Sequence, residues 1–109
     1  MSMIGVPIYQ STNSNKAVAV ALIDKEDREL VEQYHWCICE GVETRYARAY
    51  VKEDGKWKTS IMHRLIMDAP KGTVVHHING NGLDNRKSNL EVQTRGEHSK
   101  FHDNLPKGD

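Results

Sequence analysis

The chain has 109 residues, of which 38% are hydrophobic and 28% charged, and its 15 basic and 15 acidic residues give a formal net charge of zero. Such a chain has room for one domain with a modest core, and its longest apolar run, residues 17–23, is too short to cross a bilayer. The N-terminus lacks the basic start and apolar stretch of a secretory signal, so we expect a cytoplasmic protein without a membrane partner.

The first residues through Asn15 are rich in Ser, Asn and Gln and predict a loop or a weak edge strand. Residues 17–23 are continuously apolar, with several β-branched members, which is typical of a buried strand. Asp24 then has the properties of an N-cap for a helix that ends near residue 34. The apolar stripe of this helix would be Leu30, Val31 and Tyr34, with residues 25–28 exposed to solvent.

Three strands are expected next, over residues 36–40, 45–51 and 57–62. The pair Asp54-Gly55 predicts a tight hairpin turn between the last two strands. Cys37 and Cys39 are too few for a disulfide framework or a four-cysteine zinc site, so we expect both to be reduced.

Residues 63–67 fit either the end of a strand or one turn of helix, and within them we expect His63 to make a local structural hydrogen bond. Residues 68–72 contain Pro and Gly and break the pattern. Residues 73–77 are strand-like, and the Asn-Gly-Asn-Gly run at 79–82 is a strong turn signal. A polar loop leads to a strand at 90–93, and Thr94 with Glu97 forms a capping box for a helix from about 95 to 103.

Histidines are concentrated in this last segment. His98 and His102 are four residues apart on the predicted helix, a spacing that places both imidazoles on one face and suits a divalent transition metal. His76 and His77 are neighbours on a strand and must point to opposite faces, so one can bind the metal while the other acts beside it. Chance clustering is the weaker alternative, and a purely structural metal site is the serious one.

The spacing HH-x11-N-x8-H-x3-H, formed by His76, His77, Asn89, His98 and His102, resembles the HNH or ββα-metal nuclease motif. The wider text VVHHINGNGLDNRKSNLEVQTRGEHSKFH is similar to HNH endonucleases of phages and mobile elements. ALIDKEDRELVEQYHW, RYARAY and MHRLIM resemble the usual N-terminal half of these enzymes. Metal ligation by histidines is most similar to the nuclease colicins, whereas many homing-type members carry Asp at the place of His76 and Asn at that of His98.

The resemblance implies a role for each motif residue. His76, His98 and His102 would hold one divalent ion (Zn, Ni, Mn or Mg), His77 would be the general base, and Asn89 would brace the long turn. Five basic residues become candidates for phosphate contacts, although each one singly is more often a solvated charge: Arg64, Arg86, Lys87, Arg95 and Lys100. Added specificity is expected from Arg45, Arg48 and Lys52.

These expectations combine into an α+β fold in a single domain, 1–109. Short antiparallel strands with one helix occupy 16–72, and a ββα-metal module occupies 73–104. The expected function is hydrolysis of DNA phosphodiester bonds in a bacterial host cell. A monomer would nick, and a homodimer would allow both strands to be cut. Two alternatives stay open, a non-catalytic DNA-binding protein with a structural metal, and an RNase.

Overall fold

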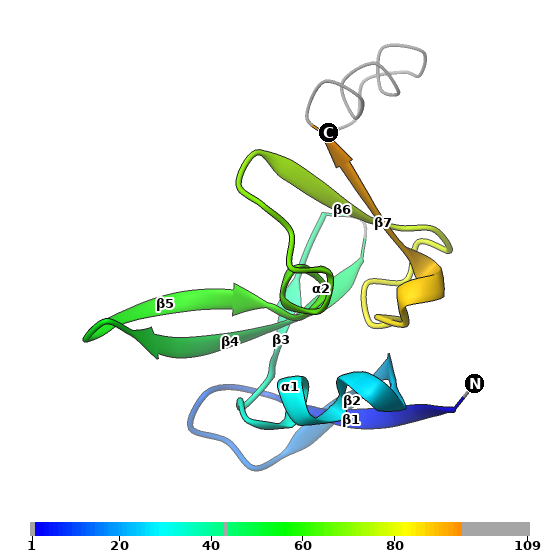
Figure 1. Cartoon of the computed structure of the whole chain (residues 1–109). Helices are drawn as coiled ribbons and strands as arrows, with labels where there is room; N and C mark the ends of the chain where they lie inside the picture. Colours follow the sequence, from blue (N-terminus) through cyan, green and yellow to red (C-terminus); the bar gives the residue numbers. More distant parts are fainter. Residues whose placement is uncertain (1, 43, 95–109) are drawn as a thin grey trace.

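The structure is a computed structural model of the chain, and it describes residues 2–42 and 44–94. Within these residues the strands are β1 Met3–Tyr9, β2 Ala17–Asp24, β3 Cys37–Glu40, β4 Arg45–Glu53, β5 Lys56–Ile61, β6 Thr73–His77 and β7 Leu90–Thr94. The helices are α1 Arg28–Glu32 and α2 Met62–Met67, with 3₁₀ turns at Lys25–Asp27 and Lys87–Asn89. The described part is therefore mixed α+β and mostly strand (Figure 1).

Five strands form one sheet in the order β2-β1-β3-β4-β5, and β6 and β7 form a second, two-stranded sheet. The prediction of a loop or edge strand at the N-terminus is wrong, because β1 pairs with both β2 and β3 and buries Val6 and Ile8. The edge position belongs to β2. Val18 and Val20 alternate with the buried Ala21 and Ile23 and lie on the other face of the strand, where they are 39% and 59% exposed. The expected fully buried strand over 17–23 is therefore corrected to a half-buried one.

The core lies between the larger sheet and the two helices. Trp36 is 1% exposed and donates its indole Nε1–H to the carbonyl of Val31 in α1 at 2.7 Å. Val75 in β6 and Leu90 in β7 belong to the same hydrophobic cluster as the residues of β1 and β2. Both sheets thus share one continuous core in the described part of the chain.

The helix predicted after Asp24 is shorter than expected. A 3₁₀ turn precedes α1, and the Asp24 side chain makes no capping hydrogen bond. Its Oδ2 instead accepts the backbone N–H of Lys87 at 2.9 Å. Of the expected apolar stripe only Val31 is buried, while Asp27, expected to be exposed, is 6% exposed.

The β4–β5 hairpin is confirmed. Its turn residues Asp54 and Gly55 have φ of 52° and 76°, the positive values that a type I′ hairpin turn requires. The ambiguous residues after β5 form helix α2, and its C-cap is Asp68, where φ is 48°. Cys37 and Cys39 are both free thiols.

The loop between β6 and β7 packs against the larger sheet. Leu22 of β2 donates its N–H to the carbonyl of Leu83 and accepts the N–H of Asn85, both at 2.7 Å. Leu83, Asp84 and Asn85 are consequently buried, although a polar loop was expected there. The strand, long turn and strand of the expected module are present, and its helix lies outside the described residues.

Candidate functional site

The end of β6 presents two histidines to different surroundings. His76 is exposed and His77 is half-buried, as the alternation of side chains along a strand requires. In the register with β7, Glu91 lies opposite His76 and Leu90 lies opposite His77. His76 therefore faces solvent beside a carboxylate, and His77 faces the loop that docks on β2.

The His77 imidazole is held by Asn85. His77 Nε2 lies 2.8 Å from Asn85 Oδ1, and Asn85 is fully buried and anchored to Leu22 through its backbone. An amide oxygen accepts a hydrogen bond, so this contact favours the tautomer with the hydrogen on Nε2 and the lone pair on Nδ1. Burial lowers the pKa of His77, with a smaller lowering by His76, against opposing effects of the Asn85 bond and of Asp84. The ring is thus neutral and basic at neutral pH.

A second histidine lies against His77. The His63 ring, from α2, meets the His77 ring at 4.5 Å between centroids in an edge-to-face arrangement. Burial, with help from His77 and Arg64, lowers the pKa of His63 to about 3. His63 Nδ1 is buried and has no hydrogen-bond partner among the described residues, so the local hydrogen bond expected of it is not seen at this atom. The neutral ring of His63 therefore packs edge-to-face against the ring of His77.

A network of side-chain bonds shapes the loop that carries Asn85. Asn89 Oδ1 accepts the N–H of Asn79 at 3.0 Å, and Asn89 Nδ2 donates to Asn79 Oδ1 and to the carbonyl of Asp84, both at 2.9 Å. Arg86 donates to both oxygens of Asp84 at 2.7 Å, and these bonds hold the pKa of Asp84 below its usual range. These are the contacts expected of a brace at Asn89, and its part in the reaction stays a prediction.

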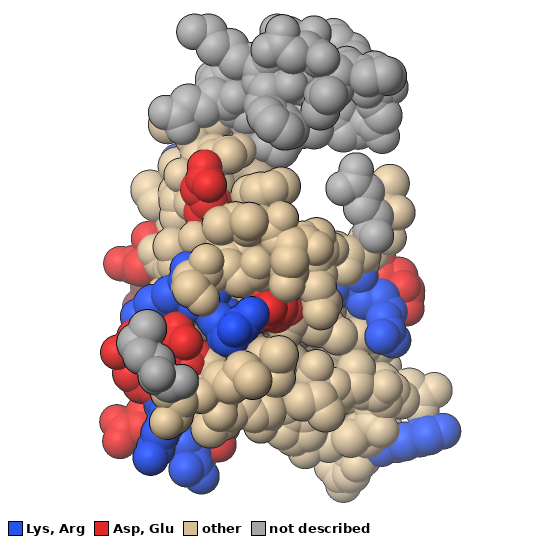
Figure 2. Space-filling view, turned by 90° about the vertical axis from the view of Figure 1, so that its right-hand side faces the viewer, with Lys and Arg blue, Asp and Glu red and all other residues tan. Residues whose placement is uncertain are grey.

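Three of the predicted phosphate-binding residues have charged groups that are hydrogen-bonded or ion-paired within the fold. Arg64 donates to the carbonyls of Thr73 at 2.6 Å and Pro70 at 3.1 Å, and Arg86 is paired with Asp84. Lys87 lies 3.1 Å from Asp27 and 3.4 Å from Glu26. Basic and acidic side chains accordingly lie beside one another on the face shown in Figure 2. Phosphate binding by these residues stays a prediction, and Arg95 and Lys100 lie outside the described residues.

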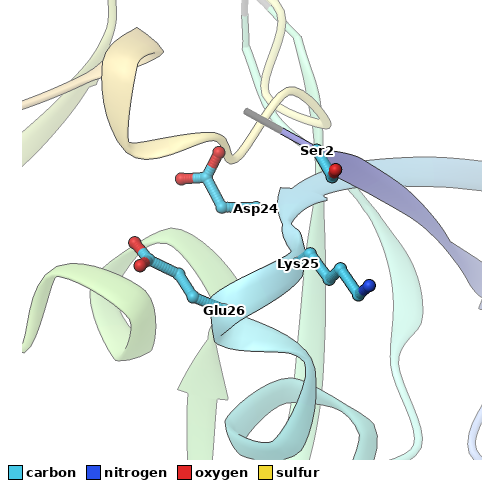
Figure 3. A pocket seen from close by; sticks show the side chains of 4 residues that line it. All are labelled: Ser2, Asp24, Lys25 and Glu26. Carbon is cyan, nitrogen blue, oxygen red and sulfur yellow. The ribbon is translucent and has the colours of Figure 1, made fainter.

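Of the three predicted metal ligands, only His76 is described, since His98 and His102 lie outside the described residues. A different group, Asp24, Glu26 and Asp27, brings ligand atoms within 4.8 Å of one another. The carboxylates of Asp24 and Glu26 point to the same side of their pocket, and the Lys25 ammonium points away (Figure 3). The Lys87 ammonium and backbone N–H already bind this trio, which accounts for its arrangement without a metal ion.

Sequence reasoning missed Asn85 and Asp84, which it placed in a polar loop without a role. The only available signal was the density of Asn and Asp between residues 79 and 89.

None of the described helices has the length and apolar character needed to cross a membrane.

Comparison with known proteins gives a match in this region. Residues 62–100 match the family model described as HNH endonuclease. Neither the curated proteins nor the solved structures gave a match. The matched segment begins at α2 and contains His63, His76, His77, Asn85 and Asn89, which are the residues that the structure gathers around β6. Over residues 62–100, the chain is therefore similar to HNH endonucleases.

Proposed function

We propose that the chain is a divalent-metal-dependent endonuclease that hydrolyses DNA phosphodiester bonds and nicks one strand as a monomer. The observation that carries this proposal is the His77–Asn85 contact at 2.8 Å beside the half-buried His63. A histidine fixed in one tautomer with a free Nδ1 is what a general base requires, and a purely structural metal site has no use for it. The family match supports a nuclease.

His77 Nδ1 would take a proton from the water that attacks the scissile phosphate. Asn85 would keep the proton of the ring on Nε2, so that the basic nitrogen is the one facing the water. The lowered pKa keeps His77 unprotonated at neutral pH. General-base help of this kind is typically worth ~10²–10⁴ in rate. Asn89 would act indirectly, by holding the loop that carries Asn85.

We further propose His76, His98 and His102 as ligands of one divalent ion. The exposed imidazole of His76 fits this role in chemistry and accessibility, and Glu91 lies opposite it on β7. When bound, such an ion polarises the phosphate and stabilises the leaving oxygen. Imidazole ligands favour Zn or Ni, and a contribution from oxygen ligands would favour Mn or Mg. We also propose that the ligand set is colicin-like, that the chain originates from a phage and that it acts in the cytoplasm.

A plasmid assay tests the function. Supercoiled DNA is incubated with the protein and Zn, Ni, Mn or Mg, with and without chelator, and a structured RNA is treated in parallel. We expect nicked circles that depend on the metal and vanish with chelator. His77→Ala should abolish nicking, and His35→Ala, a histidine that stacks on Tyr9 outside the site, should not.

Cleavage of the RNA alone would favour the RNase alternative. Absence of cleavage of either nucleic acid with every ion would favour the non-catalytic DNA-binding protein. A dimer is recognised by linear product that appears without a nicked intermediate.

A further inference from the structure

The β4–β5 hairpin extends away from the rest of the fold (Figure 1). Side chains alternate along a strand, and directly paired residues share a face. Ala47 and Ala49 of β4 are buried, so the residues between and beyond them point the other way. The register with β5 adds Trp57, opposite Lys52, to that face. The hairpin face is therefore formed by Tyr46, Arg48, Tyr50, Lys52 and Trp57.

Two aromatic residues of the hairpin face are exposed, and each lies beside a cation. Trp57 is 68% exposed and Tyr50 is 47% exposed. Lys52 Nζ lies 6.0 Å from the centroid of the Trp57 ring, and Arg48 Cζ lies 5.7 Å from that of Tyr50. Large exposed apolar groups rimmed by polar ones are typical of interaction sites. Aromatic rings alternating with cations suit a ligand that has both phosphates and apolar ring surfaces.

The charge of the hairpin face is of one sign. In β4 and β5 the acidic Glu53 lies on the opposite face, where Lys58 approaches it at 3.7 Å. Arg45 lies on the same face as Glu53. It is therefore separated from Arg48 and Lys52, the two cations with which the sequence analysis grouped it. Lys52 and Arg48 lie over rings, in contrast to Arg86 and Lys87, whose charges are bound to carboxylates. The hairpin face thus presents positive charge to an anionic partner.

Ring contacts connect the hairpin face to His77, the proposed general base. Tyr46 lies 6.1 Å from the ring of His63, and His63 lies 4.5 Å from the ring of His77. From Tyr46 to Lys52 the strand rises about 20 Å, at about 3.4 Å per residue. This is the length of about six base pairs of duplex DNA, at about 3.4 Å per step of one strand. A duplex cut beside His77 could therefore continue along the hairpin face.

We propose that the hairpin face binds the duplex DNA that flanks the scissile phosphate on one side. Arg48 and Lys52 contact backbone phosphates, and Tyr50 and Trp57 pack against the deoxyriboses. This inference rests on the proposed function and adds to it the part of the chain that holds the substrate. It also predicts a one-sided footprint, with about six base pairs of flanking duplex needed on one side of the cut and fewer on the other.

The experiment measures DNA affinity against salt in the full-length His77→Ala protein, so that cleavage does not interfere. Lys52→Gln removes a cation from the hairpin face, and Lys58→Gln removes one from the opposite face of the same hairpin. Each phosphate contact contributes about −0.9 to the slope of log affinity against log salt. We expect Lys52→Gln to reduce the slope by about 0.9 and Lys58→Gln to leave it unchanged.

Intrinsic fluorescence supplies a second readout, because Trp36 is 1% exposed and Trp57 is 68% exposed. Duplex DNA should change the emission of the His77→Ala protein, and Trp57→Phe should remove that change. Equal slopes for the two lysine variants, a change that persists in Trp57→Phe, or a response to single strands alone would each overturn the proposal. If the wild-type chain cleaves DNA and the two lysine variants have equal slopes, the proposal that the hairpin face binds DNA is wrong and the proposed function stands. A chain that neither binds nor cleaves DNA overturns both.

Discussion

The half-buried, neutral His63 should make the stability of the protein depend on pH. In the unfolded chain its pKa returns to about 6.5, and in the folded protein it is about 3. Between these values the unfolded state binds the proton and the folded state does not, so stability falls as the pH falls below about 6.5. At pH 5.0 this difference amounts to ~2 kcal/mol, at ~1.36 kcal/mol per pH unit.

His63→Phe tests this effect, because it keeps an aromatic ring against His77 and Tyr46 and removes the titrating group. Urea unfolding of both proteins at pH 7.5 and 5.0, in chelator, gives the free energy of unfolding at each pH. The wild type should lose ~2 kcal/mol more than the variant between the two values. Carboxylates and His77 titrate in both proteins and largely cancel in the comparison. Equal losses in the two proteins would show that His63 is protonated or exposed in the folded state.

Three further predictions follow from the loop and the ligands. Asn85→Ala should lower the cleavage rate by ~10-fold or more and shift His77 toward a mixture of tautomers, which is visible in its ¹⁵N NMR shifts. An unchanged tautomer would show that Asn85 does not orient the His77 ring. Asp84→Ala should cost ~1–3 kcal/mol in urea unfolding, because it leaves the donors of Arg86 and Asn79 unpaired, and a neutral result would mean that the loop is held elsewhere. His98→Ala should lose both bound metal, measured by mass spectrometry, and cleavage, and metal retained at full stoichiometry would exclude it as a ligand.

The local patterns of the second half were predictable from the sequence. The β-branched residues in 73–77 predicted β6, the Asn-Gly-Asn-Gly run predicted the turn, and the dipeptide Asp54-Gly55 predicted the β4–β5 hairpin. These signals are local, since a strand's period and a turn's backbone angles depend on neighbouring residues. The positions of His76 and His77 on opposite sides of β6 followed from the alternation of side chains along a strand.

Contacts between distant segments were not predictable. Asp24 looks like a helix cap, but its carboxylate binds the N–H of Lys87, 63 residues further on. β1 contains Gly5 and Pro7, which weaken a strand signal, and its pairing with β2 and β3 determines its conformation. Asn85 gave the same signal as any turn asparagine, because its role arises only when the loop docks on β2.

The proposed function depends on His77 as the general base of a nuclease. The most direct measurement is the single-turnover rate of DNA cleavage by wild type and by His77→Ala, at saturating DNA and with metal content confirmed equal by mass spectrometry. We expect the variant to keep its fold, its metal and its DNA affinity, and to cleave roughly 100-fold or more slowly. A variant that binds the same metal and cleaves at the wild-type rate would contradict the claim.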